Sequence, residues 1–255
     1  MIDRFADRIQ TTALTEHRLI MSVLCILFSV FFFAPLSAQT TEMETRYNAL
    51  AERFDGRDKM LQRDLKSYLQ AYPYTTFQDE VHFMQGVLQV EKGHYKQGLK
   101  ILEPVDPKAL SRDHQTDYAF YRGYAYLMMQ EYQRASIYFS QLGKGNSRYT
   151  TRGTYYYAYC MYKLERYEKA LPALKSLEDD PQYAKTVPYY LTQIYYATGD
   201  YEEAESRTNA LLREHPENLN NGELHRILGE MSFLKKDYNS AVEHLNIYRK
   251  SAAEN

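Results

Sequence analysis

The chain repeats one pattern of small, aromatic and large apolar positions. Five tyrosines are each followed three residues later by alanine or glycine, and successive tyrosines lie 37, 35, 34 and 37 residues apart. A small residue or threonine stands nine positions before each tyrosine, and mostly apolar residues follow seven and ten positions after it. Spacings of three and four are typical of amphipathic helices, so each unit is predicted to contain two helices and a turn. The pairs are Tyr95/Gly98, Tyr132/Ala135, Tyr167/Ala170, Tyr201/Ala204 and Tyr238/Ala241.

A period of about 34 residues is the signature of a helical repeat array, in which each unit contacts mainly its neighbours. The small residues would let two helices approach closely. We expect each phased tyrosine to fill the gap at the turn. The predicted helix pairs are 42–54/57–71, 77–92/94–104, 114–129/131–142, 151–164/166–178, 185–198/200–213 and 222–235/237–250.

These units resemble tetratricopeptide repeats. The pattern is fullest in residues 187–217, and a degenerate unit precedes the five others, with Asp58 where tyrosine is expected. The resemblance implies an all-α fold, an α-solenoid wound as a right-handed superhelix of five to six helix pairs. The residues of 187–217 that carry the match are Tyr195, Gly199, Tyr201, Ala204, Leu211 and Pro216.

The N-terminal segment differs in composition from the repeats. Residues 19–34 form an uncharged apolar run, followed by Pro35 and by Ser37-Ala38. This order predicts a secretory signal cleaved after Ala38, and the alternative is an uncleaved anchor in the membrane. The predicted domains are therefore a signal peptide (1–38), a degenerate helix pair (39–76), five tandem repeats (77–250) and a tail (251–255). The predicted location is the periplasm, with a possible attachment to the outer membrane.

The charge balance and the lack of catalytic motifs argue against several classes of function. Lysine and arginine number 31 against 33 acidic residues, without a polybasic run, so nucleic-acid binding is not expected. Removal of the signal would leave Cys160 alone, with no internal disulfide. The sequence has no phosphate-binding loop, H-E-x-x-H, C-x-x-C or G-x-S-x-G motif. We therefore predict no enzymatic activity, no catalytic residues, no metal site and no cofactor.

Tyrosine is in excess, with 26 residues. The resemblance implies that the first helix of each pair lines a concave groove. Exposed tyrosines in such a groove are favourable contacts for a protein partner. The predicted partner-binding residues are Phe120, Tyr124, Arg152, Tyr155, Tyr159, Tyr162, Tyr189, Gln193, Tyr196 and Arg226.

The predicted function is an exported scaffold or adaptor that binds a protein or an extended peptide, with a role in cell-envelope assembly. Tyr155 and Tyr159 occupy positions where relatives that clamp a terminal carboxylate use lysine and asparagine, so that mode of binding is disfavoured. A looser anionic contact through Lys144, Arg148 and Arg152 stays open. So does the alternative that the aromatic residues fill space between helices, as expected for Tyr156, Tyr157 and Tyr190.

The rival function is carbohydrate binding, because tyrosine rings stack on sugars. Gln193, Asp117 and Glu223 would then supply the hydrogen bonds. The end of the sequence raises a further question, since no polar capping helix follows Leu245 and Tyr248. We expect either that the chain is the front part of a longer array or that a partner or second copy covers this face.

Overall fold

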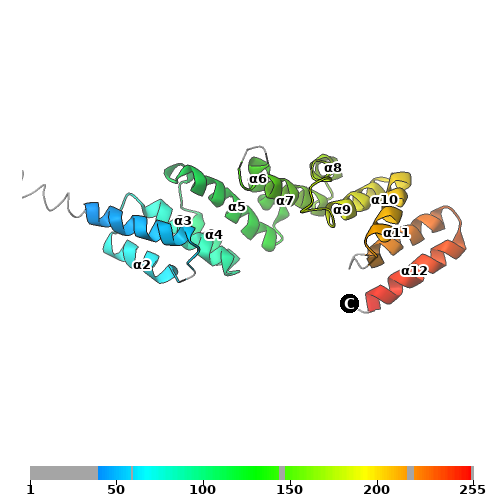
Figure 1. Ribbon diagram of the computed structural model, residues 1–255, viewed down its shortest axis with the longest axis horizontal. Coiled ribbons are helices and arrows are strands. Elements are labelled where there is room, and N and C mark those ends of the chain that lie inside the picture. Colours follow the sequence, from blue (N-terminus) through cyan, green and yellow to red (C-terminus); the bar gives the residue numbers. More distant parts are fainter. Residues whose placement is uncertain (1–39, 59, 144–146, 217–220, 254–255) are drawn as a thin grey trace, which may run out of the picture. The chain divides into compact units, whose positions relative to one another are not determined.

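The structure, a computed structural model, describes residues 40–58, 60–143, 147–216 and 221–253. All regular elements within these ranges are helical, as the sequence predicts (Figure 1). The predicted signal peptide and Lys144 lie outside the described residues. Among the helices described, none combines the length and the apolar character needed to span a bilayer.

Residues divide into two compact units, one ending at Leu88 and the other beginning at Gln89. The first unit contains a helix over 40–55, α2 (Gln62–Ala71) and most of α3 (Gln78–Glu91). The second unit begins with α4 (Tyr95–Leu102) and a short 3-10 helix, η1 (Pro107–Ala109). It continues with α5 (Arg112–Met128), α6 (Tyr132–Leu142), α7 (Thr150–Lys163), α8 (Tyr167–Lys175), α9 (Val187–Thr198), α10 (Tyr201–Glu214), α11 (Asn221–Leu234) and α12 (Tyr238–Ala253).

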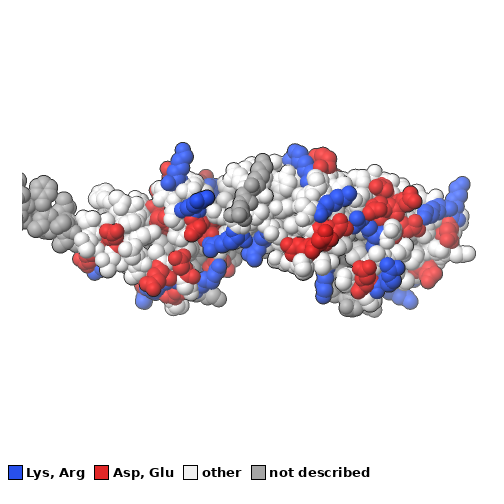
Figure 2. All heavy atoms as spheres, turned by 45° about the horizontal axis from the view of Figure 1, so that its top comes forward, with Lys and Arg blue, Asp and Glu red and all other residues white. Residues whose placement is uncertain are grey.

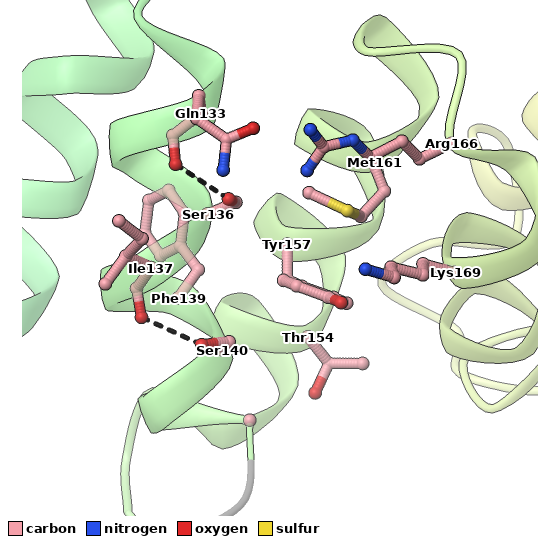
Figure 3. A pocket seen from close by; sticks show the side chains of 11 residues that line it. Gln133, Ser136, Ile137, Phe139, Ser140, Thr154, Tyr157, Met161, Arg166 and Lys169 are labelled. Carbon is pink, nitrogen blue, oxygen red and sulfur yellow. Dashed lines mark hydrogen bonds between the residues drawn. The ribbon is translucent and has the colours of Figure 1, made fainter.

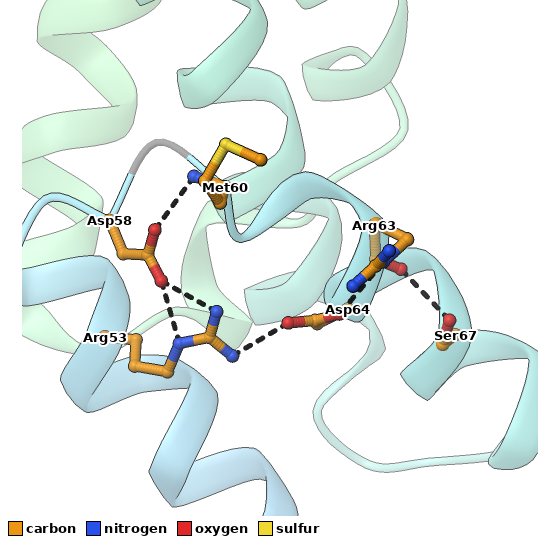
Figure 4. A network of polar contacts seen from close by, with 6 residues as sticks. All are labelled: Arg53, Asp58, Met60, Arg63, Asp64 and Ser67. Carbon is orange, nitrogen blue, oxygen red and sulfur yellow. Dashed lines mark hydrogen bonds and ion pairs between the residues drawn. The ribbon is translucent and has the colours of Figure 1, made fainter.

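In the first unit, an ionic network joins the two helices at the turn that lacks the phased tyrosine. The Arg53 guanidinium donates to Asp58 at 2.7 and 2.9 Å and to Asp64 at 2.9 Å (Figure 4). Asp58 also accepts the backbone N–H of Met60, and that bond, followed by Arg53, lowers the pKa of its carboxyl group. A polar residue at this position is therefore accommodated by Arg53. The apolar side of α2 still packs inward, with Leu65 and Tyr68 buried.

In the second unit each helix packs on the next one along the chain, from α4 to α12. Such neighbour-to-neighbour packing is typical of a repeat array. Helices α5, α7, α9 and α11 are the first members of their pairs, and α6, α8, α10 and α12 are the second members. The unit is thus the helical-repeat solenoid that the sequence predicts.

The phased tyrosines mark where the second helices begin. Tyr95, Tyr132, Tyr167, Tyr201 and Tyr238 are the first residues of α4, α6, α8, α10 and α12. Two positions before each tyrosine, the backbone is left-handed, with φ between 56° and 83°. The residues in this conformation are Gly93, Gln130, Glu165, Gly199 and Lys236. Each donates its N–H three residues back along the first helix, and the following residue donates five residues back. These paired bonds end the first helix in the manner of a Schellman motif.

The small positions allow close contact between the helices of a pair. A Cβ atom on Gly123 would lie 3.0 Å from the Phe139 ring, and one on Gly229 would lie 2.7 Å from Leu245 Cγ. Ala135, Ala170 and Ala204 are fully buried. The prediction that small residues permit this approach is correct.

The expectation that the phased tyrosines fill the gaps at the turns is wrong for the last two repeats. Tyr201 and Tyr238 are 43% and 57% exposed. Their rings instead contact an aromatic residue near the end of the preceding helix, Tyr196 and Phe233 respectively. A residue at the first position of a helix lies at the rim of the helix pair, so its ring covers the turn from outside.

Candidate functional site

Three neighbouring first helices each present one line of aromatic or amide side chains. Residues three, four and seven apart share one side of a helix. On α7 this line is Tyr155, Tyr159 and Tyr162; on α9 it is Tyr189, Gln193 and Tyr196; on α5 it is Phe120 and Tyr124. We call these eight residues the aromatic surface.

The α5 part of the aromatic surface is built around Phe120. This ring is only 6% exposed and stacks on Tyr149, with centroids 4.1 Å apart and planes 10° apart. The Arg152 guanidinium carbon lies 5.6 Å from the Phe120 ring centroid, in cation–π geometry. Tyr124 lies parallel to Phe120 at 6.1 Å and remains half-buried. Phe120 therefore supports the surface, and Tyr124 is the residue with area left for a partner.

The α7 and α9 parts meet around Tyr190. Its ring centroid lies 5.7 Å from that of Tyr159, 5.0 Å from Tyr162 and 5.4 Å from Tyr189. Tyr155 stacks on Tyr183 at 4.5 Å. The side chains of the three α7 tyrosines and of Tyr189 are half-buried. Contacts between successive first helices fix the orientation of each ring, so these rings are organised before any partner binds.

Burial moves the pKa of these phenols further above the physiological range. Desolvation raises the pKa of Tyr189 to about 12, and it raises the pKa of Tyr155, Tyr159 and Tyr162 in the same direction. The hydroxyl groups are neutral in the physiological range, as those of ordinary tyrosines are, and can both donate and accept hydrogen bonds.

At the α9–α11 junction, Tyr196 and Arg226 belong to one polar cluster. The Tyr196 hydroxyl donates to Glu230, and Arg226 pairs with Glu230 at 2.7 Å and with Glu223 at 2.8 Å. The guanidinium carbon also lies 5.8 Å from the Tyr196 ring centroid. Two carboxylates therefore hold Arg226 beside the Tyr196 ring, at the edge of the surface.

Two residues expected to bind sugars are occupied by other contacts. Asp117 is buried and holds the guanidinium of Arg148, and Glu223 pairs with Arg226. One guanidinium nitrogen of Arg148 is thus held by Asp117, while its side chain stays exposed. Gln193 is buried, and its amide nitrogen has no hydrogen-bond partner among the described residues. Only one of the three candidate sugar ligands thus lacks an internal partner.

The sequence analysis missed Tyr149 and Tyr183, which complete the aromatic surface from the loops between repeats. Both are 6% exposed, and they stack on Phe120 and Tyr155 respectively. Each lies just before a first helix, at one and four residues from the starts of α7 and α9. An aromatic residue shortly before a predicted first helix is the signal that could have located them.

Three features of the described residues bear on nucleic-acid, metal and thiol sites. Acidic and basic side chains alternate on the face drawn in Figure 2, without a large area of one sign. No group of three or more potential metal ligands occurs in the ranges described. Cys160 is buried, and burial raises the pKa of its thiol to about 12, so it is protonated at neutral pH.

Comparison with known proteins agrees with this architecture. The family model of the tetratricopeptide repeat matches residues 161–230, which contain α8, α9, α10 and most of α11. No curated protein sequence matches the chain.

Several solved structures share the fold. One is a tetratricopeptide repeat protein from Parabacteroides merdae ATCC 43184, with a TM-score of 0.56 and 15% identity over 84% of this chain and 80% of that one. MamA of strain AMB-1 has a TM-score of 0.56 and 18% identity, covering 69% of this chain and 92% of that one. A structure of MamA from residue 41 to the end, from Desulfovibrio magneticus RS-1, has a TM-score of 0.53 and 20% identity. That match covers 69% of this chain and 96% of that one. Residues 161–230 thus match the tetratricopeptide repeat, and the chain shares the helical-repeat fold of these solved structures.

Proposed function

We propose that this protein is a non-enzymatic scaffold that binds a protein partner through the aromatic surface. Helical repeat arrays commonly use an extended face for binding. The observation that carries the proposal is the continuous set of half-buried tyrosines on α5, α7 and α9, each held by ring contacts with its neighbours. Tyrosines held in this way lose little entropy on binding, which favours affinity.

The chemistry of the surface favours an extended peptide as the ligand. Neutral phenol groups can exchange hydrogen bonds with a peptide backbone while their rings contact apolar side chains. Arg226 and Glu223 at the edge of the surface are already paired with each other, and Arg152 lies over the Phe120 ring. A partner that relies on apolar and backbone contacts is therefore favoured over one recognised by its charge.

Affinity capture from a native cell extract tests this proposal. Tyr155→Ala combined with Tyr159→Ala should weaken capture of the partner by about thirtyfold, because central aromatic contacts contribute roughly 2 kcal/mol or more. Tyr74→Ala is the matched control, since Tyr74 is 97% exposed and lies in the first unit. Equal recovery of the partner by the double variant and by the control would contradict the proposal.

We further propose that the protein is exported to the periplasm and acts there in cell-envelope assembly. The support is the apolar run at 19–34 followed by Ser37-Ala38. Cell fractionation and N-terminal sequencing should find a mature chain that begins at Gln39. A chain recovered from the cytoplasm with Met1 intact would refute export.

A further inference from the structure

A cavity of about 450 Å³ lies between α6 and α8, over the side of α7 that faces away from the aromatic surface (Figure 3). Helix α7 contributes Thr154, Tyr157 and Met161 to the cavity, whereas Tyr155 and Tyr159 belong to the aromatic surface. The volume is within the range of small-molecule sites, roughly 300–1,000 Å³. Besides the three α7 residues, its lining consists of Gln133, Ser136, Ile137, Phe139, Ser140, Gly143, Arg166 and Lys169.

Two cationic side chains enter this cavity from the start of α8. Figure 3 shows the Arg166 guanidinium and the Lys169 ammonium group directed from α8 toward α6. The lining contains no carboxylate, and neither cation forms an ion pair within the described part of the chain. Both groups also lie at the positive end of the α8 dipole, which adds to their potential. The cavity is thus positively charged and offers hydrogen-bond donors.

The hydroxyl groups on the walls of the cavity are placed to accept hydrogen bonds from a ligand. Ser136 Oγ donates to the Gln133 carbonyl oxygen at 2.9 Å, and Ser140 Oγ donates to that of Ile137 at 2.8 Å (Figure 3). Thr154 Oγ1 donates to the carbonyl oxygen of Thr150 at 2.9 Å. Because each hydroxyl proton is used within its own helix, the oxygen atoms are left to accept bonds from a ligand.

From this arrangement we propose that the cavity binds a small hydroxylated organic anion, such as a sugar acid or a sugar phosphate. The anionic group contacts Arg166 and Lys169, since a guanidinium and an ammonium group are the donors that carboxylate and phosphate prefer. The ligand hydroxyls donate to the Ser140 and Thr154 oxygens. Ile137 and Met161 contact its carbon skeleton. The site is independent of the aromatic surface, and either can fail without the other.

Calorimetric titration of the full chain tests the proposal with four probes at constant ionic strength: glucuronate, glucose 6-phosphate, glucose and inorganic phosphate. We expect the two hydroxylated anions to bind at millimolar concentration or below, and more tightly than glucose or inorganic phosphate. Arg166→Gln with Lys169→Gln should weaken their binding at least tenfold, because charge-assisted hydrogen bonds are lost. Ser140→Ala should weaken it by roughly two- to tenfold.

The matched control is Lys185→Gln with Arg213→Gln, which removes the same charge from two exposed positions of the same unit outside the cavity. This control should bind both anions as the wild type does. The proposal is overturned if neither anion binds, or if the Arg166 and Lys169 variant binds them unchanged. Glucose or inorganic phosphate binding as tightly as the hydroxylated anions would also overturn it.

Discussion

Equivalent turn residues should respond to substitution with opposite signs. Glu165 and Gly199 both end a first helix with a left-handed backbone, at φ of 56° and 83°. Glu165 is exposed, and a Cβ atom on Gly199 would meet nothing within 4 Å. Substitution at either position therefore changes the backbone energy and leaves the packing unchanged. This makes the two sites a clean test of the turn geometry.

The magnitude follows from two opposing terms. A left-handed conformation costs an L-residue about 1–2 kcal/mol. Glycine loses more backbone entropy on folding, at about 0.5–1 kcal/mol. Glu165→Gly should therefore stabilise the protein by about 0.5–1 kcal/mol, and Gly199→Ala should destabilise it by a similar amount.

Urea unfolding followed by circular dichroism measures both effects. The midpoint should rise by a few tenths of a molar unit for Glu165→Gly and fall by as much for Gly199→Ala, at unchanged slope. Gln130→Gly and Lys236→Gly, at the equivalent turns, should behave as Glu165→Gly does. Shifts of the same sign for Glu165→Gly and Gly199→Ala would refute the reasoning.

Three further substitutions, with Glu42→Gln as a control for one of them, test the packing and electrostatics. Ala204→Leu should cost on the order of 1–3 kcal/mol by overpacking a fully buried position, and a thermal melt with no loss of stability would contradict this placement. Asp117→Asn should lower the free energy of unfolding, measured by urea titration, by about 1–2 kcal/mol, because it removes the charge that holds Arg148. Glu42→Gln, which breaks an exposed ion pair, should leave the free energy of unfolding almost unchanged. Equal losses for the two variants would contradict this distinction. The pKa of His225 is lowered, mainly by burial and next by the neighbouring His244. The negative charge of Glu243 acts in the opposite direction and raises this pKa in part. The folded state then binds fewer protons than the unfolded state, so stability should fall as pH drops below about 6.5. Thermal melts from pH 7.5 to 5.5 should show a smaller loss for His225→Gln, and parallel profiles would contradict this assignment.

The helical fold could be predicted from the sequence because its signals are local and repeated. Small residues at fixed distances from the phased tyrosines identify two helices and a turn, and the same tyrosines begin the second helices. The predicted helix pairs leave one residue for each turn, at 93, 130, 165, 199 and 236, but the residue type indicates a left-handed backbone only at Gly93 and Gly199. At Gln130, Glu165 and Lys236 the packing of the pair imposes the conformation on residues with no preference for it.

The candidate site could be predicted only in part, because its details depend on contacts between distant residues. Helical spacing places Tyr155, Tyr159 and Tyr162 on one side of α7, but it does not show that Phe120 is buried beneath Tyr149. The bond between Arg148 and Asp117 joins residues 31 positions apart, across two helices. The cavity between α6 and α8 likewise arises from two repeats that meet, and neither repeat contains it alone.

Site-specific photo-crosslinking tests the central claim most directly. A photoreactive phenylalanine analogue at position 159, on the aromatic surface, should form a covalent adduct with a protein partner in living cells. The same analogue at position 74, which is 97% exposed in the first unit, should form none with that partner. An adduct at position 74 and none at position 159 would contradict binding through the aromatic surface.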